Sequence, residues 1–428
     1  MHIVKPESVG LSTDRLSRVS RWLHRQVSDN RLAGASVLLS RRGKLAFFEA
    51  AGKSDLQNNK TFDEDTIVRI FSMTKPVTTV AAMMLYEEGH FQLDDPVSHY
   101  IPEFASTPVW RGGDSAITET EAVASPMTIR QLMTHTSGLT YGFMHTNVID
   151  AELREQKLEF PSSIESLEDW VKRLAAIPLM CQPGSQWNYS VATDVLGRLV
   201  EVWSGKTLDV FFQSRIFAPL KMIDTGFHVV EENRDRFSAL YNPLSGGDMS
   251  SVGKSFKASS DSTAGTSEIG LKLNESSEES HYFEETELFS GGGGLVSSMA
   301  DYANFCQMLL NGGELNGQRL LSPKTVQFMR KNQLPENRDM AAMGQPVWSE
   351  TNYEGIGFGL GFAVVVDPVK AHTITSVGEH HWGGAASTFF WVDPEEELFV
   401  VFFTQLMPSS TYPIRRELRT AIYQALID

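Results

Sequence analysis

The stretch that most restricts the folds open to this chain covers residues 66–89. A strand-like segment, 66–71, leads directly into Ser72-Met73-Thr74-Lys75-Pro76, and a helical segment follows and ends at Gly89. A serine and a lysine three positions apart at the start of a helix lie on one face, beside unpaired N–H groups and the positive end of the helix dipole. This pattern predicts a serine nucleophile at a strand-to-helix junction. An N-cap serine followed by a solvated lysine is the other interpretation.

Strand-like and helical segments are concentrated at the two ends of the chain. Helices are expected at residues 13–28, 299–310 and 414–426, and strands at 35–39, 45–48, 359–366, 373–377, 388–392 and 398–405. The last two strands flank a turn at 393–397, so we expect them to form an antiparallel hairpin. Between residues 94 and 285, prolines, polar loops and helical periodicity dominate, with helices expected at 128–133 and 164–176.

These patterns predict an α/β chain of the α+β type. We expect residues 1–93 and 286–428 to form an antiparallel sheet flanked by helices, and residues 94–285 to form an inserted, mainly helical domain. Within the insertion, residues 245–280 contain eleven serines and few apolar side chains. Such a segment is typical of a flexible loop that cannot fold alone. It is interpreted either as a lid beside the site or as a surface excursion.

The composition limits the partners that this chain can have. Its 37 Lys and Arg and 53 Asp and Glu give a net charge of −16, which argues against nucleic acid or an anionic membrane as partner. Residues 1–7 have no apolar leader, and the strongest late apolar run, 398–403, is too short to span a bilayer. Cys181 and Cys306 are the only cysteines, which fits a reducing compartment. A cytoplasmic location is therefore expected, and the oligomeric state is left open.

Several common chemistries have no motif in this sequence. It contains no G-x-S-x-G, no H-E-x-x-H or paired C-x-x-C, no P-loop lysine motif and no dinucleotide fingerprint. No cofactor and no metal are therefore expected. An enzyme built on S-x-x-K needs a base, a proton relay to the leaving group and an oxyanion hole. A lysine can act as that base when it is neutral or shares a proton with a tyrosine.

Five short segments along the chain resemble a known superfamily. They are Ser72-Met73-Thr74-Lys75, Thr134-His135-Thr136-Ser137-Gly138-Leu139, Pro183-Gly184 before Tyr189-Ser190, Gly292-Gly293-Gly294-Leu295-Val296-Ser297-Ser298 and Trp382-Gly383-Gly384. In this order they resemble the serine β-lactamase and penicillin-binding-protein superfamily. Within it, the chain looks most similar to the family VIII carboxylesterases, which share the class C β-lactamase fold. The resemblance covers residues 66–392, most of the chain.

The resemblance implies a role for each matching residue. Ser72 would be the acyl-accepting nucleophile, Lys75 its general base, and Tyr189 the relay that passes the proton to the leaving alcohol. The N–H groups of Ser72 and Ala385 would form the oxyanion hole. The segment Trp382-Gly383-Gly384 would take the place of the K-T-G strand, although His381-Trp382-Gly383 is an alternative alignment.

Two further segments match family motifs literally. Tyr302-Ala303-Asn304 reads as the class C box Y-x-N, whereas Tyr189-Ser190-Val191 lacks the asparagine. Tyr302 lies in an amphipathic helical pattern, where a tyrosine usually packs in the core, so Tyr189 is the predicted relay. Ser28-Asp29-Asn30 matches S-D-N, but it precedes the nucleophile and ends a helix, and we interpret it as accidental.

The residues that replace the K-T-G lysine bear on the substrate. In penicillin-recognising relatives that lysine helps to hold a substrate carboxylate, whereas tryptophan and glycine remove the charge and add apolar area. A pocket for neutral acyl esters is therefore expected, with His381, Trp382, Gly383 and Gly384 in contact with substrate. Phe143 and Trp187 either line the acyl pocket or pack, and Trp382 could also be a core residue. His135 is interpreted as a buried structural histidine.

Three functions follow from these observations. The first is a serine carboxylesterase that acts on a small-molecule ester, short-chain or aryl, through an acyl-enzyme on Ser72, with acyltransferase or weak β-lactamase side activity. The second is a β-lactamase or D-Ala-D-Ala peptidase, which the missing lysine disfavours. The third, of another class, is a catalytically silent binding protein of the same fold.

Overall fold

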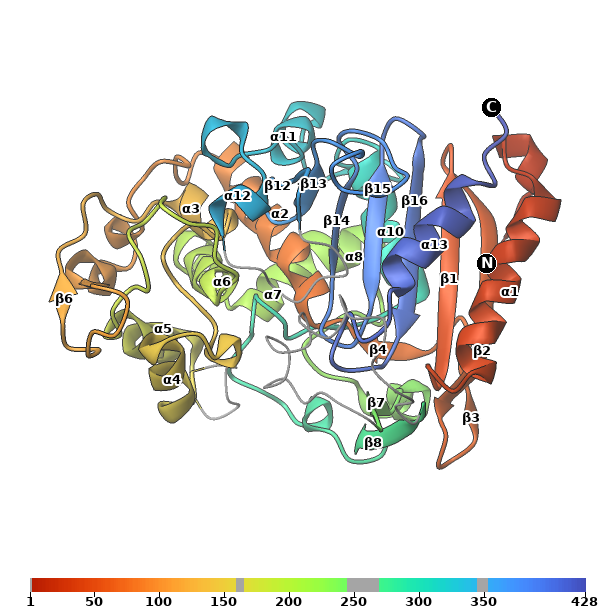
Figure 1. Cartoon of the computed structure of the whole chain (residues 1–428), viewed down its shortest axis with the longest axis horizontal. Coiled ribbons are helices and arrows are strands. Elements are labelled where there is room, and N and C mark those ends of the chain that lie inside the picture. The colour runs from red at the N-terminus through yellow and green to blue at the C-terminus, as the bar shows by residue number, and fades with distance from the viewer. Residues whose placement is uncertain (1, 159–164, 245–268, 345–352) are drawn as a thin grey trace.

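An eight-stranded antiparallel sheet forms the centre of the computed structural model (Figure 1), which describes residues 2–158, 165–244, 269–344 and 353–428. In spatial order the strands are β12 (Ile356–Phe358), β13 (Ala363–Val365), β14 (His380–Gly383), β15 (Phe389–Asp393), β16 (Leu398–Thr404), β1 (Gly34–Arg41), β2 (Lys44–Asp55) and β3 (Lys60–Thr61). Strand β1 pairs with β16 on one side and β2 on the other. Both ends of the chain therefore build one sheet, as expected.

Helices cover both faces of this sheet. Along β16, Val400 and Phe402 pack with α1 (Thr13–Ser28) and α13 (Ile414–Tyr423), whereas Phe399, Val401 and Phe403 pack in the core that contains α2 (Thr74–Glu87) and α10 (Met299–Leu310). Successive side chains of a strand point to opposite faces. A strand with apolar residues at every position is therefore covered on both sides, and β16 is buried throughout.

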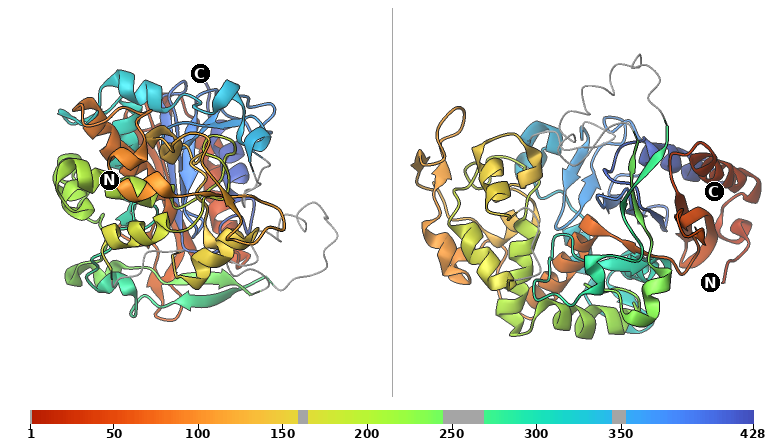
Figure 2. Two further views of the ribbon diagram at one scale, coloured as in Figure 1. Left: turned by 90° about the vertical axis from the view of Figure 1, so that its left-hand side faces the viewer. Right: turned by 90° about the horizontal axis from the view of Figure 1, so that it is seen from below.

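The segment between α2 and α10 is mainly helical, and its helices between residues 129 and 204 lie on the side of α2 away from β1 (Figures 1 and 2). Its helices are α3 (Ile129–Met133), α4 (Val148–Glu155), α5 (Leu167–Ala175), α6 (Ala192–Ser204), α7 (Leu208–Phe212) and α8 (Ala218–Leu220). None of its described residues contributes a strand to the eight-stranded sheet. Helix α6 packs directly against α2.

Four short strand pairs lie outside the eight-stranded sheet in the described residues. Strand β4 (Ile67–Arg69) pairs with β9 (Val296–Ser298), which connects this segment to the part of the chain before α2, and β7 (Leu240–Pro243) pairs with β8 (Leu271–Glu275). The β4–β9 pair matters for function, because it brings the glycine-rich turn before β9 beside the turn that follows β4. The remaining short pairs are β5 (Val109–Trp110) with β6 (Thr120–Glu121) and β10 (Glu314–Leu315) with β11 (Gln318–Arg319).

Several sequence-based expectations for individual elements are wrong. Residues 373–377 form no strand: their β-branched side chains Ile374 and Val377 are exposed and have no neighbouring strand to pair with. Strands β12 and β14 were not expected, and the strand expected at 359–366 is confined to β13. The loop expected at 245–280 includes strand β8, while its part 245–268 lies outside the described residues.

None of the described helices has the length and apolar character that a bilayer crossing requires. Two further short α-helices, α11 (Pro323–Met329) and α12 (Met340–Met343), lie between β11 and β12.

Candidate active site

Ser72 lies in a tight turn between β4 and α2. The turn covers Phe71–Met73, and Phe71 has a φ of 42°, in the left-handed region that non-glycine residues rarely adopt. This sharp bend turns Ser72 toward a pocket that is also lined by Tyr189, Trp382 and Ala385. Helix α2 then begins at Thr74 and places Lys75 on the face of Ser72, as the spacing predicted.

Lys75 is the centre of a buried hydrogen-bond network. The side chain is only 2% exposed, and its Nζ lies 3.1 Å from Ser72 Oγ, 3.0 Å from Tyr141 Oη and 2.6 Å from the carbonyl oxygen of Gly292. The three contacts come from the turn before α2, from the segment after α3 and from the glycine-rich turn before β9. An amine has three directions for hydrogen bonds, so these contacts fix its position.

Tyr189 contacts the same serine. Its hydroxyl donates to Ser72 Oγ at 2.6 Å, and its ring lies 4.7 Å from Lys75 Nζ. Tyr302, the literal motif match, is fully buried and donates to the carbonyl oxygen of Met73 at 2.9 Å. The structure thus brings Tyr189 to Ser72 and packs Tyr302 beneath the turn. Ser28 ends α1, far along the chain from this network.

Tyr141 is a site residue that the sequence analysis missed. It lies two residues beyond the segment 134–139, and its ring stacks on Phe143 with centroids 4.6 Å apart. Burial raises the pKa of Tyr141 well above its usual value, and the neighbouring Tyr189 and Asp194 add to this effect. The phenol therefore stays neutral. An aromatic residue directly after a matched segment is the one signal that could have drawn attention to it.

His135 has a structural setting, as expected. It is buried, its Nδ1 lies 3.2 Å from Ser190 Oγ, and its ring packs against Tyr189. Burial, followed by the charge of Lys75, lowers the pKa of His135 well below its usual value. A neutral imidazole therefore supports the aromatic wall behind Tyr189.

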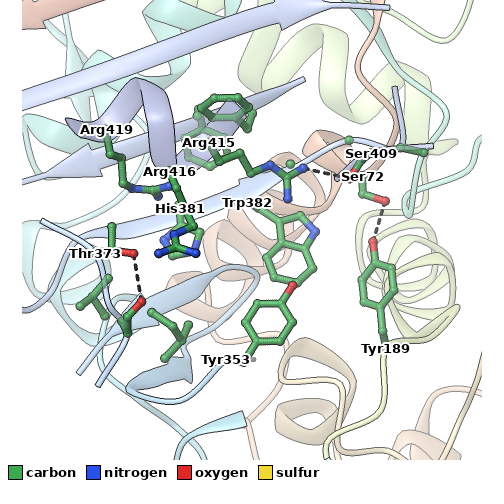
Figure 3. A pocket seen from close by; sticks show the side chains of 18 residues that line it. Ser72, Tyr189, Tyr353, Thr373, His381, Trp382, Ser409, Arg415, Arg416 and Arg419 are labelled. Carbon is green, nitrogen blue, oxygen red and sulfur yellow. Dashed lines mark hydrogen bonds between the residues drawn. The ribbon is translucent and has the colours of Figure 1, made fainter. Parts of the chain in front are cut away.

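The end of β14 forms one wall of the pocket (Figure 3). His381, Trp382, Gly383, Gly384 and Ala385 line it together with Ser72 and Tyr189. The Trp382 ring lies 5.5 Å from that of Tyr189, so this tryptophan faces the site rather than only the core. Trp187 and Phe143 were expected either to line the acyl pocket or to pack in the core. Trp187 is fully buried behind Tyr189, and Phe143 stacks on Tyr141. Neither is among the described residues that line the pocket.

A close approach of two backbones brings Ala385 toward Ser72. A Cβ on Gly384 would lie 2.3 Å from the carbonyl oxygen of Ile70, so only glycine lets the end of β14 lie against the segment that leads to Ser72. The N–H of Gly384 is bound to the carbonyl of Thr388, whereas that of Ala385 donates to no backbone acceptor in the described ranges. The role of Ala385 as an oxyanion donor therefore stays a prediction.

Helix α13 contributes a charged wall that the sequence analysis did not predict. Arg415, Arg416 and Arg419 line the pocket. Arg415 Nη2 donates to Ser409 Oγ at 3.2 Å and lies so close to Gly383 that a Cβ there would be 2.4 Å away. The K-T-G lysine is absent from the Trp382 segment, but α13 brings other cations to the same pocket. On the sequence these arginines look like the solvated face of an amphipathic helix, and only the packing of α13 turns them toward the site.

Comparison with known proteins places this geometry in a family. The family model described as Beta-lactamase matches residues 19–424. Protein Rv1367c of Mycobacterium tuberculosis is 32% identical over 387 residues, 88% of this chain and 86% of that protein. Esterase EstB of Burkholderia gladioli is 29% identical over 419 residues, 95% of each chain.

A solved structure agrees with these relatives. EstCE1, described as a hydrolase with promiscuous acyltransferase activity, has a TM-score of 0.74 and 27% identity, over 96% of this chain and 99% of that chain. The antiparallel sheet, the helices on both faces and the Ser72–Lys75 turn thus occur in a chain that matches the family model over nearly its whole length. The chain belongs to the Beta-lactamase family and is similar, within it, to an esterase and to an acyl-transferring hydrolase.

Proposed function

We propose that this protein is a serine carboxylesterase that cleaves short-chain or aryl esters through an acyl-enzyme on Ser72, with acyl transfer or weak β-lactamase activity as a side reaction. Its similarity to an esterase and to an acyl-transferring hydrolase supports the reaction class. The observation that carries the proposal is that Ser72 Oγ, at a pocket, contacts both Lys75 Nζ at 3.1 Å and Tyr189 Oη at 2.6 Å.

Acylation begins with the proton of Ser72. Lys75, in the fraction of molecules in which it has lost its proton, takes this proton as Oγ attacks the ester carbonyl carbon, and the carbonyl oxygen becomes an oxyanion. The N–H groups of Ser72 and Ala385 bind that oxygen. When the oxyanion collapses, the bond to the alcohol breaks, and Tyr189 relays the proton from Lys75 to the leaving oxygen.

Deacylation repeats these steps with a second oxygen nucleophile. Water gives a proton to the Lys75–Tyr189 pair, attacks the acyl carbon and releases the acid, while the proton returns to Ser72 Oγ. An alcohol in place of water gives a new ester, which is acyl transfer. The same groups serve both outcomes, so the ratio depends on which nucleophile occupies the pocket.

The pocket walls support an ester with an apolar or aromatic part. Trp382, Phe389, Phe390, Ile356 and Val365 line it, and burial of apolar area against them stabilises bound substrate. The arginines of α13 form another part of the wall, and guanidinium groups attract anions. The preference for neutral over anionic esters drawn from the missing lysine is therefore not part of this proposal.

A β-lactamase or D-Ala-D-Ala peptidase would use the same serine. The replacement of the K-T-G lysine by the Trp382 segment disfavours it, and relative rates on p-nitrophenyl butyrate and nitrocefin separate the two functions. A silent binding protein is disfavoured because Ser72, Lys75 and Tyr189 are all within hydrogen-bond distance.

Covalent trapping tests the proposal directly. A p-nitrophenyl alkylphosphonate should add one phosphonyl group to the protein, on the peptide that contains Ser72, and should abolish hydrolysis of p-nitrophenyl butyrate. Ser72→Ala should lose both labelling and turnover, whereas Ser28→Ala, the accidental motif match, should keep both. Esterase activity retained in Ser72→Ala, or labelling on another residue, would overturn the assignment.

A further inference from the structure

A carboxylate that the mechanism above does not use lies behind Lys75. Asp194, in the first turn of α6, is 1% exposed. Its Oδ1 accepts the Ser290 hydroxyl at 2.6 Å and the N–H of Gly292 at 2.9 Å. The carbonyl of the same Gly292 holds Lys75 Nζ at 2.6 Å. One residue of the glycine-rich turn therefore connects Asp194 to the amine.

The turn is held tightly between two helices. A Cβ on Gly292 would lie 2.4 Å from Asp194 Oδ2, so the carboxylate is in close contact with the turn backbone. On the other side, Thr78 of α2 donates to the carbonyl of Gly291 at 2.7 Å. A shift of Asp194 would thus move the Gly292 carbonyl, and Lys75 would lose one of its three contacts.

The charge of Asp194 needs an explanation of its own. Burying a carboxylate is costly unless it is paired or hydrogen-bonded, and an asparagine oxygen could accept the same two hydrogen bonds without a charge. Burial raises the pKa of Asp194, while the positive charge of Lys75 and the bonds from Ser290 and Gly292 act against this rise. The carboxylate therefore interacts with Lys75 electrostatically.

We propose that Asp194 is a positioning residue of the esterase reaction. It fixes the turn 290–294 so that Gly292 holds Lys75 against Ser72, and its negative charge stabilises the ammonium group that forms when Lys75 takes the serine proton. The inference rests on the proposed function. It adds to that function a buried group that acts through Lys75 and touches no substrate.

The other titratable groups around Lys75 belong to three segments: His135 after α3, Tyr141 beyond it and Tyr189 before α6. Burial lowers the pKa of His135 and raises that of Tyr141, each well away from its usual value. Both shifts favour the neutral form of the side chain at neutral pH. A change in the pH profile of an Asp194 variant therefore reports on Asp194 and the Lys75–Ser72–Tyr189 network.

Asp194→Asn separates the charge from the hydrogen bonds, because the amide oxygen can still accept from Ser290 and Gly292. We expect kcat for p-nitrophenyl butyrate to fall about tenfold with KM little changed. The acid limb of the kcat/KM profile should move to lower pH by about half a unit or more, because a negative neighbour no longer favours the protonated network. Asp194→Ala, which also frees the turn, should lose about a hundredfold in kcat.

Asp301→Asn is the matched control. Asp301 is also a buried aspartate, and it accepts one backbone N–H, from Asp224, and one hydroxyl, from Thr225. It lies in α10 outside the Lys75 network, so its variant should change the unfolding midpoint and not the pH profile. Ser290→Ala, which removes one hydrogen bond and keeps the carboxylate, should lower kcat severalfold and leave the acid limb in place.

The inference would be overturned if Asp194→Asn kept the wild-type kcat and acid limb, or if Asp301→Asn shifted that limb equally. If Asp194→Asn fails to fold, Ser290→Ala decides the positioning role: an unchanged kcat contradicts it. Failure of the proposed function looks different, because wild-type protein would then not be phosphonylated on Ser72 at any pH.

Discussion

Two phenols flank Lys75, and they differ in what they touch. Tyr189 Oη contacts the nucleophile Ser72, whereas Tyr141 Oη lies 3.0 Å from the amine of Lys75. The raised pKa of Tyr141, caused first by its burial, keeps its proton in place. We therefore interpret Tyr189 as the relay and Tyr141 as a neutral group that orients Lys75.

Removal of the relay or the base should nearly stop the reaction. Lys75→Ala and Tyr189→Phe should each lower kcat by two or more powers of ten, because each removes a group that moves the serine proton. Steady-state hydrolysis of p-nitrophenyl butyrate measures this. Tyr302→Phe, which loses only a hydrogen bond to the Met73 carbonyl, should keep a kcat within severalfold of wild type. A larger loss of kcat in Tyr302→Phe than in Tyr189→Phe would make Tyr302 the relay.

Tyr141→Phe should have a smaller effect. The ring can still stack on Phe143, while Lys75 loses one of its three hydrogen bonds, so kcat should fall about tenfold with KM unchanged. Stopped-flow acylation by a p-nitrophenyl ester would show whether the loss lies in the first step. An acylation rate equal to that of the wild type would mean that two hydrogen bonds suffice to hold the Lys75 amine.

At the scale of elements, the site depends on how closely β14 approaches the turn before α2. Gly384→Ala would place a methyl group 2.3 Å from the Ile70 carbonyl oxygen. The end of β14 must then move away, taking the Ala385 N–H from the oxyanion position, and kcat should fall about a hundredfold. Gly226→Ala is the control, since a Cβ there meets its nearest atom at 3.5 Å; a similar loss in both would point to general destabilisation.

An element could be predicted when its local sequence pattern determines it, and not when it depends on pairing with distant strands. Helices α1 and α10 and the β15–β16 hairpin follow from local periodicity and turn residues, and they appear at the expected places. Strand β14 reads His-His-Trp-Gly and has little strand propensity of its own, yet β13 and β15 pair with it on both sides. Residues 373–377 have a high strand propensity, but no neighbouring strand pairs with them.

The same distinction applies to the candidate site. Ser72 and Lys75 lie three residues apart, and the resemblance supplied Tyr189. No motif singles out Asp194, because its contact with Gly292 depends on the packing of α6 against the turn before β9. Arg415 likewise reaches the pocket only because α13 folds back over the sheet. Contacts between distant segments carry no local pattern.

At the scale of the whole molecule, a buried ion pair joins the pocket wall to the last helix. Glu379, fully buried before β14, accepts two bonds from Arg419 of α13 at 2.9 and 3.1 Å, and His381 Nδ1 lies 2.7 Å from it. Burial raises the pKa of the Glu379 carboxyl, but the charge of Arg419 and the contact with His381 outweigh burial and bring it well below its usual value.

Glu379→Gln should therefore destabilise the protein, because Arg419 is left buried without its counter-charge, by roughly 3–5 kcal/mol at pH 7. A carboxyl with a lowered folded-state pKa contributes stability above its ordinary value of 4.5, and this contribution is lost as the pH falls below it. Urea unfolding at pH 7 and pH 4 should show the difference from wild type narrowing at the lower pH. An exposed pair gives the control: Glu336→Gln, opposite Arg338, should change little at either pH.

Because β1 pairs with β16, the central sheet has a gap until residues 398–404 have been synthesised and have left the ribosome. A nascent polypeptide that already carries its nucleophile still lacks the opposite wall of the pocket. Translation that stops early should thus release an inert product with an open strand edge, prone to aggregation. The proposed hydrolytic activity should therefore appear only after β16 and α13 have been added to the growing chain.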